Sequence, residues 1–334
     1  MWGAAYADPW YTRSTTVGLR AGVNRPNTLR AGVYAAYRTD YRDLVLGVDA
    51  VRRWELEETG FNYERRIAGP WGDTDGAESP QRASLYHRWI LKQSTSLYLH
   101  PMLYHEAFAS YQDNFLPFAR NRVRGAERWD RAWTLGWHLR ANLYTPYWDP
   151  EQGVWFDVTT GVGQVEMPGW TATGQLRAEL AGVQQLPDGL GPLGRARVAG
   201  RVVGMGALPD EGMFFALGGS TLFRGYDLAE RQGSVLWVGN AELRYPIVED
   251  VQWDVLDHCI GARNVWAVGF YDVGDVYANG KSVGGRVAHA LGGGLRVDVA
   301  VFSFIERATL RFDFAKTIND ATPFQFWFGL QHAF

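Results

Sequence analysis

The sequence predicts an all-β fold: a transmembrane antiparallel β-barrel of sixteen strands, or fourteen if two segments merge, in one domain over residues 1–334. Three observations favour it. Apolar and polar residues alternate in segments of about ten residues, the length of a tilted strand that crosses a membrane. Aromatic residues make up 14% of the chain, with 15 Trp, enough for the aromatic girdles of such a barrel. The C-terminal segment ends on an apolar stripe.

That last segment, Phe324–Phe334, shows the alternation clearly. Because a strand has a period of two, Gln325, Gly329 and Gln331 share the opposite face. An apolar stripe on a soluble edge strand would favour aggregation, whereas lipid covers it in an outer-membrane barrel. The apolar face carries Phe324, Phe326, Phe328, Leu330, His332 and Phe334.

Fifteen segments read as strands, and the short Trp2–Tyr6 stretch is taken as a weak sixteenth at the start. An even number is expected, because bacterial barrels of one chain have even strand counts. The fifteen are Tyr11–Val23, Asn27–Thr39, Arg42–Trp54, Thr59–Ala68, Arg82–Gln93, Thr95–Gln112, Arg128–Tyr144, Gly153–Val165, Thr171–Leu186, Arg195–Ala207, Ser234–Ile247, Val265–Val276, Gly285–Val301, Arg307–Lys316 and Phe324–Phe334.

Charged residues fill one face of several later strands. In Arg307–Lys316, for example, Arg311 and Asp313 share a face, and Phe312 and Phe314 point the other way. Neighbouring charged faces would be costly in the dry core of a soluble sandwich, because buried ions need full pairing. They suit a hydrated barrel interior, where arginines and carboxylates pair across strands.

Composition narrows the alternatives. The mean hydropathy of −0.23 is neutral, as alternation produces, and no run approaches about 18 apolar residues. A net charge of −3 without a basic run gives no reason to expect nucleic acid as a partner. The single Cys259 excludes an intrachain disulfide.

No signal peptide is visible at Met1, so an upstream part is expected to be missing. A soluble Trp-rich carbohydrate-binding protein is the alternative on composition alone.

Counting back from a periplasmic C-terminus assigns each connection to a side of the bacterial outer membrane. The turns Asn24–Pro26, Pro187–Gly194 and Val248–Asn264 then lie in the periplasm. The external connections are Gly69–Pro80, Asp113–Glu127, Leu208–Gly233 and Ala278–Gly284.

The longest external connection contains a Gly-rich approach to Phe223-Arg224-Gly225-Tyr226. It is followed by the strand Gly239–Ile247, by Phe270-Tyr-Asp-Val-Gly274, and by a terminal aromatic residue, Phe334. In this order the motifs resemble the BamA/TamA superfamily, the bacterial surface antigen barrels of protein insertases and two-partner-secretion translocators. The resemblance is specific over residues 217–334. Over the first 200 residues it rests only on the regular succession of predicted strands.

The resemblance implies that the sixth external loop folds into the lumen and docks there. The residues themselves point the same way: Phe270 and Asp272 are expected to face inward, and an inward carboxylate suits the planar fork of Arg224. Glu242 is the second-choice partner. Gly225 would permit a tight turn and a close approach to the wall. The alternative is an ordinary external loop with a surface Arg224.

The resemblance further implies a lateral seam between the first and last strands, where client polypeptides engage. Gly329 would weaken packing there, or would simply make room for a neighbouring Trp. The Trp2–Tyr6 strand, interrupted at Asp8-Pro9, is a poor partner for the last strand. Outer-membrane lipid, client or partner polypeptides and an upstream periplasmic domain or other subunits are the expected partners.

No enzyme and no cofactor is predicted. The histidines lie in no recognisable nucleophile motif. Adjacent His258-Cys259 lacks the spacing of a zinc site, and the acidic segment Gly72–Glu78 reads as a solvated loop rather than a calcium site.

Two other functions stay open. A barrel without periplasmic domains could anchor or scaffold a fused domain or a partner complex. A passive diffusion porin is the second alternative, although a porin constricts its lumen with an earlier loop and has no need for Phe223–Tyr226 followed by five strands.

Overall fold

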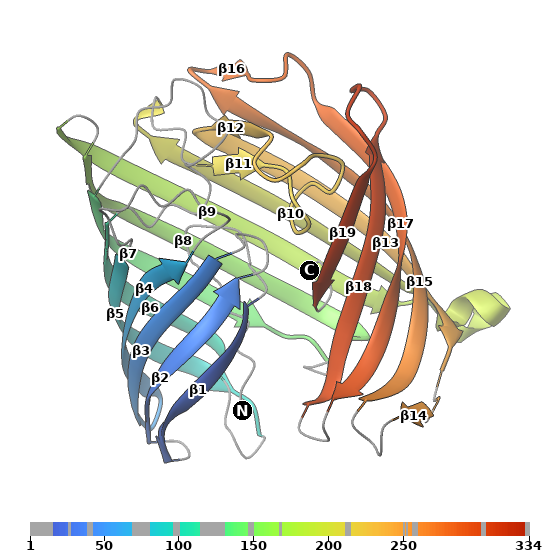
Figure 1. Ribbon diagram of the computed structural model, residues 1–334, viewed down its shortest axis with the longest axis horizontal. Coiled ribbons are helices and arrows are strands. Elements are labelled where there is room, and N and C mark those ends of the chain that lie inside the picture. The colour runs from blue at the N-terminus through green and yellow to red at the C-terminus, as the bar shows by residue number, and fades with distance from the viewer. Residues whose placement is uncertain are drawn as a thin grey trace.

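The computed structural model describes most of the chain as one antiparallel sheet. It describes residues 16–25, 28–38, 43–68, 81–95, 101–113, 131–145, 150–166, 169–210, 215–249, 251, 253–255, 260–301 and 305–330. Within them, seventeen strands form a single sheet and two more form a separate hairpin. Successive long strands pair antiparallel in chain order, and the sheet curls round to face itself (Figure 1).

The sheet strands lie close to the expected segments. Their bounds are β1 (Thr16–Arg25), β2 (Leu29–Arg38), β3 (Asp43–Trp54), β4 (Glu57–Ala68), β5 (Gln81–Gln93), β6 (Pro101–Asp113), β7 (Arg131–Asn142), β8 (Gln152–Glu166), β9 (Trp170–Gln185), β10 (Arg197–Leu208), β13 (Val235–Val248), β14 (Trp253–Val255), β15 (Ile260–Ala278), β16 (Lys281–Ser282), β17 (Ala288–Val301), β18 (Ile305–Thr317) and β19 (Gln325–Leu330). The separate hairpin consists of β11 (Phe215–Leu217) and β12 (Arg231–Gly233).

The prediction of an all-β antiparallel barrel fold is confirmed. Two of the seventeen sheet strands, β14 and β16, have three residues or fewer, which leaves fifteen long strands that correspond to the fifteen expected ones. The expected sixteenth strand, Trp2–Tyr6, lies outside the described residues. Among the residues that the structure describes, no register joins β1 to β19. In the same part of the chain, no helix is long and apolar enough to span a membrane.

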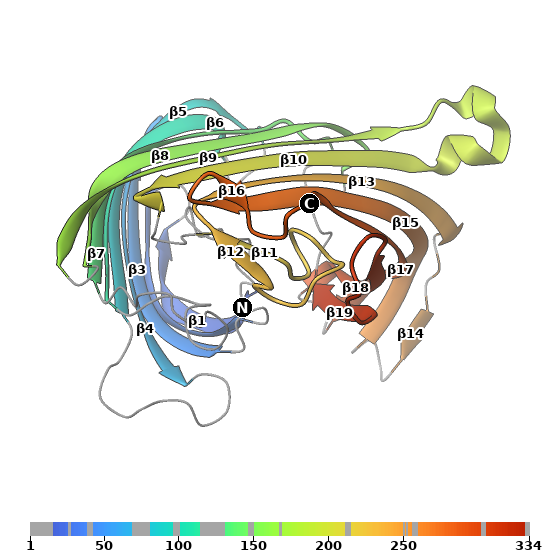
Figure 2. The ribbon, with the colours of Figure 1, turned by 90° about the horizontal axis from the view of Figure 1, so that it is seen from above.

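The two faces of the sheet differ as the alternation predicts. On β13, Asn240, Glu242 and Arg244 are buried inside, whereas Leu243 and Ile247 are exposed on the outer face. On β18, Arg311 and Asp313 are buried and Phe314 is 46% exposed. Viewed from above, the sheet surrounds β11 and β12 (Figure 2), so the charged inner face surrounds an inserted segment.

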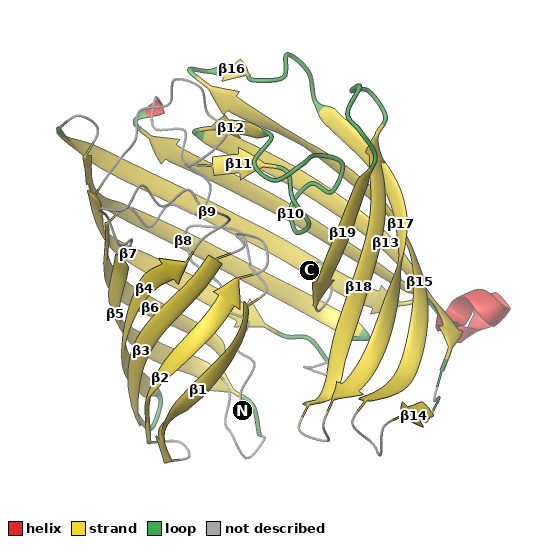
Figure 3. Cartoon of the chain, in the orientation of Figure 1, coloured by secondary structure: helices red, strands yellow, loops and turns green. Residues whose placement is uncertain are grey.

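Two connections carry structure that the sequence did not predict. The turn between β9 and β10 contains a 3-10 helix, η1 (Asp188–Arg195), which projects away from the sheet (Figure 3). The connection between β13 and β15 contains β14, which pairs with the start of β15 from Ile260 to Ala262. The pairing of β15 with β17 shifts register between Ala262 and Val265. That extension explains why β15 begins five residues before the expected Val265.

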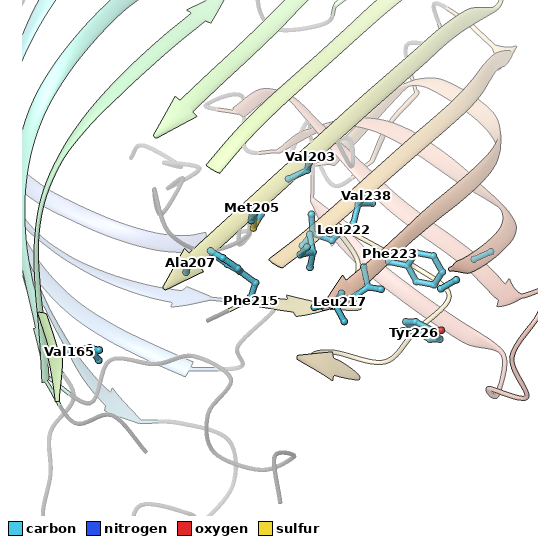
Figure 4. Close-up of a cluster of buried hydrophobic side chains, with 14 of the residues drawn as sticks. Val165, Val203, Met205, Ala207, Phe215, Leu217, Leu222, Phe223, Tyr226 and Val238 are labelled. Carbon is cyan, nitrogen blue, oxygen red and sulfur yellow. The ribbon is translucent and has the colours of Figure 1, made fainter. Parts of the chain in front are cut away.

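A buried apolar cluster holds the inserted segment against the wall. Phe215, Leu217 and Leu222 of the segment belong to one buried cluster with Val203 of β10 and Val238 of β13 (Figure 4). All five are at most 3% exposed. This apolar contact brings the rest of the loop next to the charged inner faces of β13 and β15.

Candidate functional site: the loop docked in the lumen

The connection between β10 and β13 folds back inside the sheet and positions the predicted motif. We call residues Phe223–Tyr226 the tip. The approach to the tip is held through its main chain: Arg201 Nη2 donates to the carbonyl of Thr221 at 2.5 Å, and Asn240 Nδ2 donates to that of Leu222 at 2.8 Å. Inner-wall side chains thus satisfy loop carbonyls that water would otherwise bind.

Arg224 and Asp272 lie together, fully buried. The guanidinium donates from Nε to Oδ2 at 2.9 Å and from Nη2 to Oδ1 at 2.7 Å. The backbone N–H of Arg224 donates to the same Oδ2 at 3.1 Å. Asn240 Nδ2 adds a bond to Oδ1 at 2.8 Å. The two parallel bonds form the fork geometry that makes arginine a specific partner for a carboxylate.

Glu242 binds the remaining side of the guanidinium. Arg224 Nη1 donates to Glu242 Oε1 at 2.5 Å and lies 3.6 Å from Asp313 Oδ2. The guanidinium carbon lies 3.4 Å from the ring centre of Phe270, on the same strand as Asp272. Arg224 is 1% exposed, so carboxylates and an aromatic face replace its hydration.

The surrounding charges nearly balance. Glu242 also pairs with Arg244 at 2.8 Å and lies 3.5 Å from Arg296, which pairs with Asp313 at 2.5 Å. Burial alone would lower the pKa of Arg224, but the carboxylates of Asp272 and Glu242 outweigh it and hold that pKa above its usual range. The arginine is therefore charged, and its three acidic neighbours offset that charge.

Gly225 lies directly on the wall. A Cβ at this position would be 2.5 Å from the Cβ of Ala290 on β17 and 3.0 Å from Cγ2 of Thr317 on β18. Its φ is not in the left-handed region, so close approach, and not a special turn, is what requires glycine here.

Phe223 and Tyr226 pack against each other, with ring centres 4.6 Å apart. The Tyr226 hydroxyl donates to Asp320, in the connection between β18 and β19. Arg231 and Arg286 donate to the two oxygens of the same carboxylate at 2.6 and 2.7 Å. Burial raises the pKa of Asp320, but hydrogen bonds from Tyr226 and Arg286 outweigh it, and the net result is a lowered pKa.

The closing strand presents its aromatic residues outward. Phe324, Phe326 and Phe328 are 61%, 54% and 54% exposed. Gly329 is buried, and a Cβ there would lie 3.1 Å from Nη2 of Arg311. It makes room for an arginine, and not for the Trp that the sequence suggested. The backbone of Leu330 pairs with Leu310; the side chain of Leu330 and the whole of Phe334 lie outside the described residues.

Sequence reasoning missed several residues that contact the tip, among them Trp327 and Asp320. Trp327 Nε1 donates to the carbonyl of Arg224 at 2.9 Å, and Asp320 binds Tyr226. Trp327 shares the inward phase of Gln325 and Gly329, so the alternation alone could have placed it in the lumen. Asp320 lies in a turn and carried no comparable signal.

No group of three or more metal-binding side chains forms in the described ranges. The site is a buried ion-pair clamp, in which Arg224 of the loop binds Asp272 and Glu242 of the wall. These three residues do not place a nucleophile beside a base.

Comparison with known proteins supplies the context. A model of the Omp85 superfamily domain matches residues 3–334. Among solved structures, CdiB from Escherichia coli resembles the chain with a TM-score of 0.50 at 10% sequence identity. The match covers 94% of this chain and 61% of CdiB, so the chain spans about 61% of the length of that structure. At this identity the likeness shows the fold alone. No curated protein matches the sequence.

Proposed function

Because the chain belongs to the Omp85 superfamily, whose barrels reside in the bacterial outer membrane, we propose that it inserts or transports polypeptides at a lateral seam between its first and last strands. Members of this superfamily are transport proteins that handle polypeptide clients. The observation that carries the proposal is the buried clamp of Arg224 on Asp272 and Glu242, which keeps a long loop inside the lumen.

The clamp is costly to form, because its ions are taken out of water. Apolar residues of similar volume would often stabilise a fold as well as a buried ion pair does, so we infer that this clamp is retained because it holds a defined geometry. The geometry here fixes the tip beside β15, β17 and the terminal hairpin. In the proposed function the docked loop braces the lumen and the strands next to the seam.

The seam itself is inferred from the terminal strand. β19 pairs with β18 over the six residues Gln325–Leu330, and its outward Phe326 and Phe328 would face lipid or a client. With the C-terminus in the periplasm, η1 lies on the periplasmic side and the β18–β19 connection lies outside. Lipid, client polypeptides and an upstream periplasmic domain or another subunit are the proposed partners.

Photo-crosslinking in cells tests this function. A photoreactive amino acid at Phe328, on the outer face of β19, is expected to crosslink to polypeptides in the outer membrane, and the same residue at Val162, an exposed outer position on β8, is not. Equal crosslinking at both positions, or none at Phe328, would contradict the proposal.

An anchor or scaffold for a fused domain or a partner complex is the second candidate. An anchor would give no polypeptide crosslinks at Phe328 but would co-purify with a fixed partner. Planar-bilayer recordings separate both from a porin: a docked loop predicts small, erratic currents, and a porin predicts steady open pores.

A further inference from the structure

The tip of the loop is bound to the terminal hairpin as well as to the wall that carries Asp272. Trp327 lies in β19, 103 residues from Arg224 in the sequence, and its indole N–H donates to the Arg224 carbonyl at 2.9 Å. One residue therefore contacts Asp272 through its side chain and the last strand through its main chain. A shift of the tip by more than about an ångström would break the second bond, because such bonds weaken beyond about 3.2 Å.

A second set of bonds joins the same two parts. Asp320, between β18 and β19, accepts hydrogen bonds from Tyr226, at the end of the tip, and from Arg231 of β12. Thr322 Oγ1 lies 3.4 Å from the Gly225 carbonyl. Asp320 is thus a shared acceptor for two residues of the inserted segment, and its side chain is only 16% exposed.

The contacts are continuous across the inner wall. Moving outward from Asp272 on β15, the tip touches Ala290 on β17 through Gly225, then Thr317 at the end of β18, and finally Trp327 on β19. The tip therefore spans from β15, across β17 and β18, to β19, the last described strand.

We propose that Trp327 and Asp320 are positioning residues that couple the docked loop to the terminal strand, so that undocking of the tip and loosening of β19 are one event. Coupling of this kind is reciprocal. Undocking of the tip shifts the equilibrium between paired and loosened β19 by some factor. Loosening of β19 must shift the docking equilibrium of the tip by the same factor. If the proposed function holds, β19 at the seam becomes available to a client only when the tip has undocked from the inner wall. This consequence rests on the proposed function. The coupling itself does not.

Hydrogen exchange of the full chain in lipid vesicles tests the coupling in both directions. Trp327→Phe keeps an aromatic ring and removes the donor, and it is expected to speed amide exchange at residues 221–226 by about three- to tenfold, the effect of losing one neutral hydrogen bond. Asp320→Asn should act in the same direction. In return, Arg224→Ala should speed exchange at residues 325–330. Trp237→Phe, on the outer face of β13, is the matched control and should change neither segment.

The outcomes separate the coupling from the function. If Trp327→Phe leaves residues 221–226 unchanged, or if Arg224→Ala speeds exchange only within the loop, the coupling is refuted. If both variants speed exchange in the distant segment while polypeptide crosslinking at Phe328 is absent in the parent protein, the coupling holds and the proposed function fails. Since Arg224→Ala tests the coupling from the opposite side, poor folding of one Trp327 variant does not decide the result.

Discussion

At the scale of single residues, the molecule depends on buried ions that are paired several times over. Asp272 is fully buried and receives bonds from the side chain and backbone of Arg224 and from Asn240. A carboxylate with this many donors is well satisfied, and each donor matters because Asp272 is shielded from bulk water. Removing one partner is therefore much more harmful than the net worth of the pair suggests.

Replacing Arg224 tests this directly. Arg224→Ala leaves Asp272 and Glu242 without their shared cation and should lower the free energy of unfolding by roughly 3–5 kcal/mol. Arg224→Lys keeps the charge but loses the fork, and an intermediate loss is expected. Urea unfolding in vesicles, followed by tryptophan fluorescence, measures both. Arg195→Ala, which breaks an exposed pair with Glu249, is the control and should have little effect; an equal loss there would refute the argument.

Gly225 allows a test based on space alone. A Cβ at 2.5 Å from that of Ala290 must displace the tip, so Gly225→Ala is expected to destabilise the protein by about 1–3 kcal/mol. Adding Ala290→Gly should recover part of the loss in the same unfolding assay. Gly204→Ala, on β10, where a Cβ would meet nothing within 4 Å, is the control. Absence of rescue would mean that Phe223 or Thr317 sets the limit instead.

At the scale of elements, alternation predicted the strands well and the loops poorly. The expected Arg42–Trp54 became β3 (Asp43–Trp54) and the expected Arg307–Lys316 became β18, because inward charge and outward apolar side chains fix both the strand and its face. Contacts such as Trp327 to Arg224 depend on where a loop folds in space, which local pattern does not encode. The hairpin of β11 and β12 was missed for the same reason.

The connection between β18 and β19 should weaken in acid. Since the pKa of Asp320 is lowered in the folded protein, its ionised form stabilises the fold above its unfolded pKa of about 4, and this contribution is lost as the pH falls through the lower folded value. The stability difference between the parent protein and Asp320→Asn should therefore be largest near neutral pH and shrink below about pH 4. Urea midpoints at several pH values measure it.

Asp188→Asn, at the exposed start of η1, is the matched control for that series. At neutral pH its difference from the parent should be small, because the Asp188 side chain is exposed. A difference for Asp320→Asn that grows on acidification would contradict the sign of the effect.

At the scale of the whole molecule, the two faces of the sheet separate lipid from charge. Outer positions such as Val202 and Leu176 are more than half exposed, while Glu179 and Arg201 on neighbouring strands are buried inside. A fold organised in this way needs no contiguous apolar run in its sequence, which is why mean hydropathy alone could not identify it. The strand topology predicts which end of the barrel faces the cell exterior.

Labelling of intact cells tests the orientation. In a Cys259→Ser background, a cysteine at Ser282 of β16 is expected to react with a membrane-impermeant maleimide, because the connection between β15 and β17 is predicted to be external. A cysteine at Leu193, on η1, should react only after the outer membrane is permeabilised. The reverse pattern would place the C-terminus outside.

The glycine beside Arg311 has a consequence for alignment. Gly329 is paired with Arg311 across β18 and β19, and the arginine side chain lies over the space where a Cβ would be. Sliding β19 by one residue would turn its phenylalanines toward the lumen, and sliding it by two would set the bulky Trp327 or Gln331 against that guanidinium. The space at Gly329 that Arg311 occupies therefore favours the observed register over its neighbours whenever the β18–β19 hairpin re-forms.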